Sequence, residues 1–93
     1  MIKKFRCKET EKVFKRKFSR KLPRNIQRVA LRKLNIIHAV LVIKDLLIPP
    51  SNNLKELKGK RKGQYSIRIN NQWRICFKWI DNDAYDLEII DYH

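Results

Sequence analysis

The fold is decided by residues 65–90, which read YSIRINNQWRICFKWIDNDAYDLEII. Apolar and polar side chains alternate in this stretch with a period of two, which is the spacing of a β-strand with one buried face. The alternation is interrupted at residues 70–71 and again at residues 81–83, and both interruptions consist of Asn and Asp, which favour tight turns. The stretch therefore predicts a meander of three antiparallel strands.

Two helices are expected before this meander. Thr10 is suited to cap a helix of about residues 11–19, and Pro23 suits the first turn of a second helix. The second helix has an apolar stripe at three- and four-residue steps, formed by Ile26, Val29, Ala30, Leu34 and Ile37. Its opposite face is expected to carry Arg24, Arg28, Arg32 and Lys33. A break is predicted at residues 47–53 and a short strand at residues 1–6.

These elements define the fold class. The helices have to cover the apolar face of the sheet, so the sequence predicts an α+β fold in which a small antiparallel sheet has N-terminal helices packed on one face. Residues 1–93 are expected to form a single domain, because a chain of 93 residues has room for one core. The other face of the sheet is expected to be polar and cationic and to form the floor of a site. Its side chains are those of Ser66, Arg68, Arg74, Cys76, Lys78 and Glu88.

The charge of the chain indicates its partner. Lys and Arg number 23 against 9 Asp and Glu, which gives a net charge of +14. All of the basic residues lie within residues 1–78, whereas residues 79–93 contain five acids and no Lys or Arg. Repulsion among so many like charges opposes compaction and favours a polyanionic partner, with nucleic acid ahead of an anionic membrane surface.

Cysteine usage and hydropathy indicate the compartment. Cys7 and Cys76 lack the spacing of a zinc site and are expected to be buried thiols. The acidic residues form no obvious metal-binding cluster, so neither a metal nor another cofactor is expected. No secretory signal is visible, and the longest apolar stretch, residues 36–43, is far shorter than the ~20 residues of a membrane span. A cytoplasmic protein without membrane association is expected.

Three clusters contain residues suited to chemistry. Residues 54–63, LKELKGKRKG, form either a loop that grips phosphate or a solvated charged loop. Arg74 has a planar fork that suits a phosphate, or else it pairs with Glu88 on the next strand. Residues 91–93, Asp-Tyr-His, combine groups that exchange protons with a ring that stacks on a base, or else they form a frayed end. His38 is expected to be structural.

Three motifs occur in order in the second half of the chain. They are LKGKRKGQYSIRIN at residues 57–70, QWRICF at residues 72–77 and DYH at residues 91–93. In this order they resemble the HigB toxins of the RelE/ParE superfamily, which belong to type II toxin–antitoxin systems. The resemblance implies a microbial RNase-like fold that cuts messenger RNA in the ribosomal A site by attack of the 2′-hydroxyl, without a metal, and so inhibits translation. It also implies a HigA-type helix-turn-helix antitoxin as partner, with DNA reached only through that antitoxin.

The resemblance also implies roles for single residues. Lys58 matches a family lysine that contacts the RNA phosphate, and Arg74 matches an arginine proposed to stabilise the transition state. Asp91, Tyr92 and His93 match residues implicated in acid–base work and in orienting RNA, and proton transfer is expected from His93 or Asp91.

The chain departs from the family pattern at two positions. Lys55 stands where some relatives have a histidine, and Asn70 stands where some have an arginine, so the general base is not assigned. Further RNA contacts are expected from the basic residues of the charged loop and the first hairpin strand, namely Lys55, Lys60, Arg61, Lys62 and Arg68.

Two other functions are compatible with the sequence. One is a non-catalytic, ParE-like toxin that acts on DNA gyrase, although Arg74 and residues 91–93 argue against it. The other is an RNA-binding accessory protein without activity. In that protein, loss of Arg74 would weaken RNA binding no more than loss of another basic residue.

Overall fold

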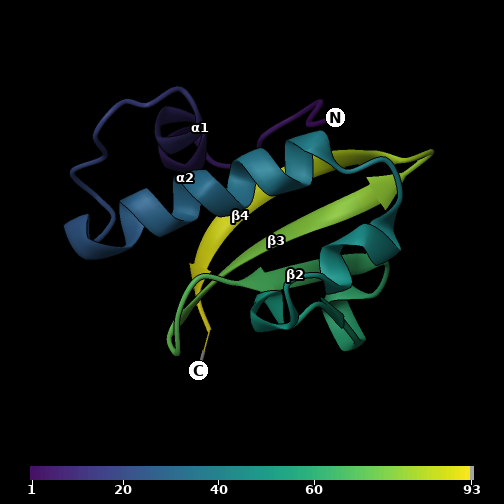
Figure 1. Ribbon diagram of the computed structural model, residues 1–93. Helices are drawn as coiled ribbons and strands as arrows, with labels where there is room; N and C mark the ends of the chain where they lie inside the picture. Colours follow the sequence, from purple (N-terminus) through teal and green to yellow (C-terminus); the bar gives the residue numbers. More distant parts are fainter. Residues whose placement is uncertain (93) are drawn as a thin grey trace.

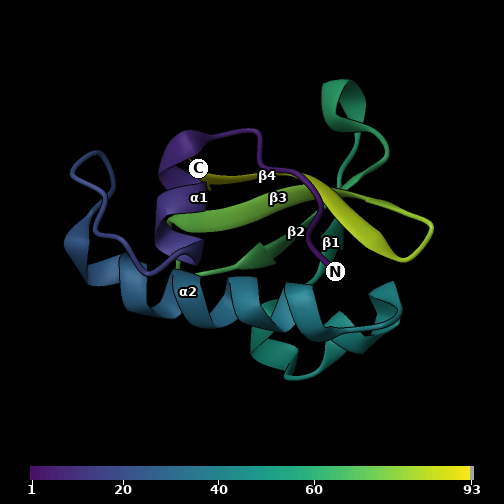
Figure 2. The ribbon, with the colours of Figure 1, turned by 90° about the horizontal axis from the view of Figure 1, so that it is seen from above.

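The predicted meander is present and is extended by a short fourth strand. The computed structural model describes residues 1–92, and within them two helices pack on one face of an antiparallel sheet in the order β1-β2-β3-β4 (Figures 1 and 2). The helices are α1 (Lys8–Phe14) and α2 (Arg24–Ala39), and the strands are β1 (Lys55–Glu56), β2 (Gln64–Arg68), β3 (Trp73–Ile80) and β4 (Asp83–Asp91). Three 3-10 turns lie at Ile43–Leu47, Pro50–Asn52 and Gly59–Arg61. The α+β class is therefore confirmed.

A bulge in β4 changes which side chains enter the core. The β3–β4 register shifts between Cys76 and Lys78, and Asp86 has a left-handed backbone with φ 54°. Beyond the bulge, Lys78 lies opposite Tyr85, so Tyr85 shares the polar face of the sheet. Ala84 is fully buried instead. The strict alternation of buried and exposed side chains that is expected along β4 is wrong here, because the extra residue of the bulge exchanges the two faces of the strand.

Helix α2 supplies most of the helical side of the core. Four residues of its predicted stripe are at most 2% exposed, and they pack with apolar residues of β2, β3 and β4. They are Ile26, Ala30, Leu34 and Ile37. Figure 2 shows α2 lying along the sheet. The assignment of Lys33 to the exposed helix face is wrong: this side chain is only 5% exposed.

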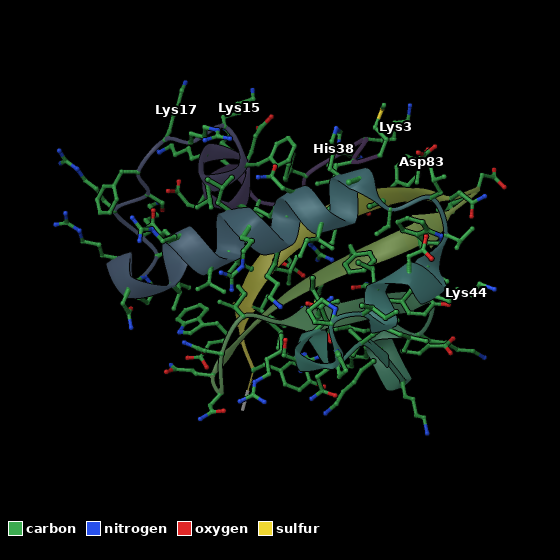
Figure 3. The ribbon with its side chains drawn as sticks, in the orientation of Figure 1. Lys3, Lys15, Lys17, His38, Lys44 and Asp83 are labelled. Carbon is green, nitrogen blue, oxygen red and sulfur yellow. The ribbon has the colours of Figure 1, made fainter. Side chains whose placement is uncertain are left out.

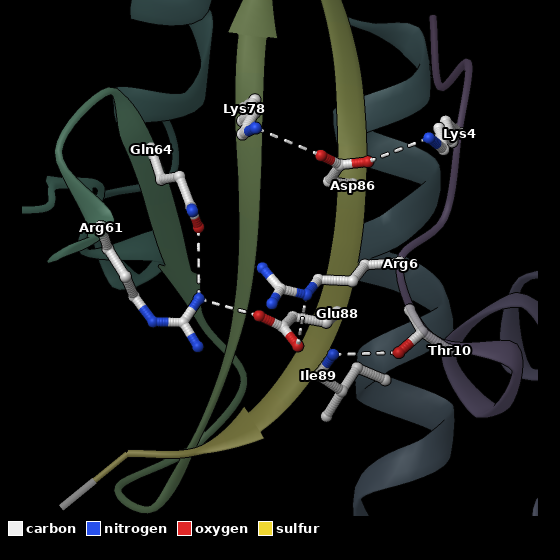
Figure 4. Close-up of polar contacts among 9 residues, drawn as sticks. All are labelled: Lys4, Arg6, Thr10, Arg61, Gln64, Lys78, Asp86, Glu88 and Ile89. Carbon is white, nitrogen blue, oxygen red and sulfur yellow. Dashed lines mark hydrogen bonds and ion pairs between the residues drawn. The ribbon is translucent and has the colours of Figure 1, made fainter.

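Helix α1 begins and ends earlier than predicted. Cys7, not Thr10, is the N-cap residue, and the chain leaves the helix at Arg16 with a positive φ of 64°. Thr10 lies inside the helix and is fully buried. Its hydroxyl accepts a hydrogen bond from the backbone N–H of Ile89 at 2.9 Å, which satisfies a donor on the outer edge of β4 (Figure 4).

The first six residues cover the rest of that edge. Ile2 and Phe5 form single parallel bridges with Ala84 and Leu87 of β4, so the short strand predicted at residues 1–6 is reduced to two isolated bridges. His38 accepts a hydrogen bond from the backbone N–H of Ile2 at 3.0 Å, and its ring contacts Phe14 edge-on at 5.4 Å. These contacts confirm a structural role for His38. Within residues 1–92, no helix is long and apolar enough to cross a membrane.

The Thr10–Ile89 hydrogen bond should be measurable as stability. We expect Thr10→Val to lower the free energy of unfolding by about 1–3 kcal/mol, because it leaves a buried backbone donor without an acceptor. Thr10→Ser keeps the hydroxyl and is the control. Urea denaturation checks the prediction, and a valine variant as stable as the serine variant would contradict it.

Candidate active site on the polar face of the sheet

Arg74 is the most constrained cation on the polar face. It is 5% exposed, and its Nε donates to Ser66 Oγ at 2.8 Å. Its Nη2 donates to the carbonyl oxygen of Ser66 at 3.2 Å and to that of Asn53. Burial lowers the pKa of Arg74, but a guanidinium ionises so far above neutrality that it stays charged. The result is a positive charge held in one orientation by β2 and by the end of the Pro50–Asn52 turn.

Tyr92 lies against this arginine. The Cζ atom of Arg74 is 5.7 Å from the centre of the Tyr92 ring, within the range of a cation–π contact. The backbone N–H of Tyr92 donates to the carbonyl oxygen of Gln72 at 2.6 Å, and the Gln72 side chain donates to Asp91 at 3.0 Å. The β2–β3 hairpin therefore holds both residues, so neither belongs to a frayed end. His93 lies outside the described residues.

Arg74 and Tyr92 line a polar cavity of about 240 Å³. The other lining residues are Asn53, Lys55, Arg68, Asn70 and Asn71. This lining combines three basic side chains with three amides and contains no carboxylate. Such a set of donors can bind an anion, and the tyrosine ring at its edge offers a surface for stacking a base.

Lys58 and its neighbours lie in a different place. Lys58 lines a separate cavity of about 290 Å³ with Glu56, Leu57, Gly59 and Lys62. Lys58, Lys60 and Lys62 are exposed. The structure thus brings Arg74, Tyr92, Lys55 and Arg68 to one cavity and does not bring Lys58 to it.

Glu88 binds a different arginine from the one considered in the sequence. Its carboxylate accepts a hydrogen bond from Arg61 Nη1 at 2.8 Å and lies 3.9 Å from Arg6 Nε (Figure 4). The hydrogen bond to Glu88 raises the pKa of Arg61. The Arg74–Glu88 pair is therefore not formed, and Arg74 is left without a carboxylate partner among residues 1–92.

The polar face is thus divided electrostatically. The carboxylate of Asp86 lies 3.4 Å from Lys78 Nζ and 4.0 Å from Lys4 Nζ (Figure 4). Together with Glu88, it offsets the charge of the basic side chains that surround residues 86–88 of β4. Other lysines, such as Lys15 and Lys17, project outward from the surface (Figure 3). The cavity around Arg74 keeps its positive charge.

Three cavity residues were missed in the sequence. Asn53, at the end of the break, has a left-handed backbone with φ 46° and presents its carbonyl oxygen to Arg74. The sequence marks Asn70 as a turn residue and a departure from the family pattern, and Asn71 as a turn residue alone, and both line the cavity. Their polar character was visible, but their convergence depends on how the turns fold back.

Within residues 1–92, no group of three or more His, Cys, Asp and Glu could hold a metal ion.

Comparisons with known proteins agree with the resemblance. The sequence model of a family described as "RelE-like toxin of type II toxin-antitoxin system HigB" matches residues 3–93. Toxin HigB-1 of Vibrio cholerae serotype O1 is 43% identical over 65 residues, covering 70% of this chain and 68% of that protein. Endoribonuclease HigB of Proteus vulgaris is 50% identical over 40 residues, covering 43% of this chain and 44% of that protein.

Solved structures show the same fold. YafQ from Escherichia coli superposes with a TM-score of 0.60 at 14% identity, covering 98% of this chain and 91% of that chain. YoeB in the heterotetrameric YoeB–YefM toxin–antitoxin complex of Staphylococcus aureus superposes with a TM-score of 0.63 at 20% identity, covering 100% and 95%. At these identities the likeness concerns the fold, and the activity has to be argued from the site.

The two cysteines should differ in reactivity. Cys76 is fully buried under the polar face, and burial raises its pKa to about 11, whereas Cys7 is half-buried, contrary to the expectation of two buried thiols. Since the thiolate is the reactive form, we expect a thiol reagent at pH 8 to modify Cys7 in the native protein and Cys76 only after unfolding. Mass spectrometry of Cys7→Ser and Cys76→Ser checks this. Rapid labelling of native Cys7→Ser would contradict it.

Proposed function

The chain belongs to the HigB-like family of RelE-like toxins of type II toxin–antitoxin systems, and on this premise we propose that it is a ribosome-dependent endoribonuclease that cuts messenger RNA. The observation that carries the proposal is the cavity around Arg74, where a desolvated and rigidly held guanidinium meets further cations and no carboxylate. The Proteus relative bears the name of an endoribonuclease, which supports the same activity.

The proposed reaction is transfer of the phosphodiester to the neighbouring 2′-oxygen. A base takes the proton of the 2′-hydroxyl, the bond from O2′ to phosphorus forms, and the bond from phosphorus to O5′ breaks. An acid then protonates O5′. The products are a 2′,3′-cyclic phosphate and a free 5′-hydroxyl, and a metal ion is not required in this scheme.

Arg74 is suited to stabilise the negative charge that develops on the phosphate. Its Nε and Nη2 are engaged by Ser66 and Asn53, which leaves Nη1 without a protein acceptor within residues 1–92. Donors that are already oriented need no rearrangement when charge develops, which is the main advantage of a preorganised site. Lys55 and Arg68, on the same cavity, would bind adjacent phosphate oxygens.

The remaining roles follow the family pattern. We assign proton transfer to Asp91 or His93 and stacking of an RNA base to Tyr92, whose ring is held against Arg74. Lys58 is proposed to contact RNA at the rim, because it is exposed and outside the Arg74 cavity. The ribosome is proposed to present the message to this site, in the A site of the small subunit.

The partner and the compartment are part of the proposal. A HigA-type helix-turn-helix antitoxin would inhibit the toxin and connect it to DNA. The YoeB protein of similar fold is bound to an antitoxin in a heterotetramer, which supports an antitoxin as partner. The substrate is translated message, so the proposed compartment is the cytoplasm.

Cleavage of ribosome-bound message should depend on Arg74. We expect Arg74→Ala to slow cleavage by roughly 10²–10³-fold, the usual effect of removing one preorganised donor, and Arg74→Lys to restore only part of the rate. The measurement is cleavage of a defined messenger RNA by purified protein, with and without ribosomes. His93→Ala tests the residue that lies outside the described part of the chain.

Arg20→Ala is the matched control, because Arg20 is exposed and lies outside the cavity. Circular dichroism verifies that each variant is folded. If the wild type cuts no RNA with ribosomes present, the proposed activity is wrong.

RNA affinity should fall steeply with salt. Each phosphate neutralised by a basic residue releases condensed counterions, so we expect a slope of about −0.7 in log affinity against log salt for each contact. Titrating a single-stranded RNA between low and physiological salt measures the slope. A flat response would show that the charge of the chain is not the source of its affinity.

A further inference from the structure

Lys33 on α2 is a buried cation whose charge is not offset by an acid. It is 5% exposed, and its Nζ donates to Asn52 Oδ1. No carboxylate within residues 1–92 forms an ion pair with it, and burial, together with the neighbouring Arg32, lowers its pKa. An ammonium group has three N–H donors, so one amide oxygen leaves two of them without a protein acceptor. Burying such a charge is costly unless something compensates for it.

The residue that binds Lys33 is itself held in place by hydrogen bonds. Asn52 is fully buried, and its Nδ2 donates to the carbonyl oxygens of Leu46 at 3.1 Å and Ile48 at 3.3 Å. These two bonds fix the amide so that its oxygen is presented to Lys33. The turn at Pro50–Asn52 thus holds the lysine side chain in place in the wall of a cavity.

The cavity lined by Lys33, of about 410 Å³, lies between α2 and the end of the β2–β3 hairpin. Its polar lining consists of Arg32, Lys33, Arg68, Ser51 and Asn70, and again no carboxylate lines it. Arg68 and Asn70 also line the Arg74 cavity, so the two cavities adjoin along the hairpin. A strand of RNA bound in the Arg74 cavity could therefore continue along Arg68 and Asn70 into the cavity that Lys33 lines.

We propose that the cavity between α2 and the β2–β3 hairpin binds a second RNA backbone phosphate, which belongs to a nucleotide flanking the reacting one, with Lys33 as its central donor. A phosphate supplies several acceptor oxygens and the negative charge that the lining lacks. This inference rests on the proposed function, because it takes RNA as the ligand. It adds a second phosphate-binding subsite to the proposed active site.

The first experiment measures binding of a fully 2′-O-methylated single-stranded RNA, which cannot be cleaved because it lacks a free 2′-hydroxyl. We expect Lys33→Gln to weaken affinity by roughly tenfold, the usual value of a hydrogen bond to a charged group, and to reduce the salt slope by about 0.7. Lys44→Gln is the matched control, because Lys44 is exposed and projects away from the sheet (Figure 3). Equal effects of the two substitutions would overturn the proposal.

The second experiment locates the phosphate. Single neutral methylphosphonate linkages are placed in turn along the RNA. We expect one linkage, different from the one that is cut in unmethylated message, to weaken binding to the wild type but not to Lys33→Gln. This loss of additivity identifies a direct contact. Additive effects at every linkage would overturn the subsite.

A third variant separates binding from folding. Lys33→Met keeps the length of the side chain without its charge, and thermal melting identifies the temperatures at which each variant is folded. If Lys33 only supports the turn, the variants will melt earlier but bind RNA normally while folded, which overturns the proposal. If the wild type binds this RNA through Lys33 yet cuts no message on ribosomes, the subsite stands and the proposed activity fails.

Discussion

Strand β3 alternates its side chains between two environments, and the core and the candidate site both depend on this alternation. Ile75 and Phe77 are fully buried in the core beneath α2, whereas Arg74 points to the opposite face, where it is held by Ser66. The period of a strand is two, so a slip of one residue in the pairing with β2 would exchange the two faces. The packing that stabilises the core therefore also positions the guanidinium.

The distribution of acids decides where the positive charge of the chain can act. Most basic residues extend into solvent, where their repulsion is weak and screened. Glu88 and Asp86 offset neighbouring arginines and lysines on the polar face. The linings of the cavities around Arg74 and Lys33 contain no carboxylate, although both side chains are nearly buried. Two nearly buried cations without an acidic partner among residues 1–92 are a cost to stability, which an anionic ligand at each cavity would offset.

The relatives place this site in context. The fold is shared with YafQ and YoeB at identities of 14–20%, so the architecture tolerates extensive change in sequence. The HigB relatives are much closer in sequence, at 43% and 50% over the aligned residues. Since one fold can support several activities, the proposal for this chain rests on the cavity and its charges rather than on the fold.

Local sequence pattern was enough to predict the fold class, the α2 stripe and the meander, and to place Arg74 on the polar face of the sheet, because periodicity and local turn chemistry are properties of neighbouring residues. It did not reveal that Lys33 is buried, that Glu88 binds Arg61, or that Asn53 and Asn71 join the cavity. It also missed the bulge at Asp86, which exchanges Tyr85 for Ala84 in the core. Each of these depends on which distant segments meet. The sequence groups Lys33 with the arginines on the exposed face of α2, but the turn that carries Asn52, 19 residues away, packs against it and leaves it only 5% exposed.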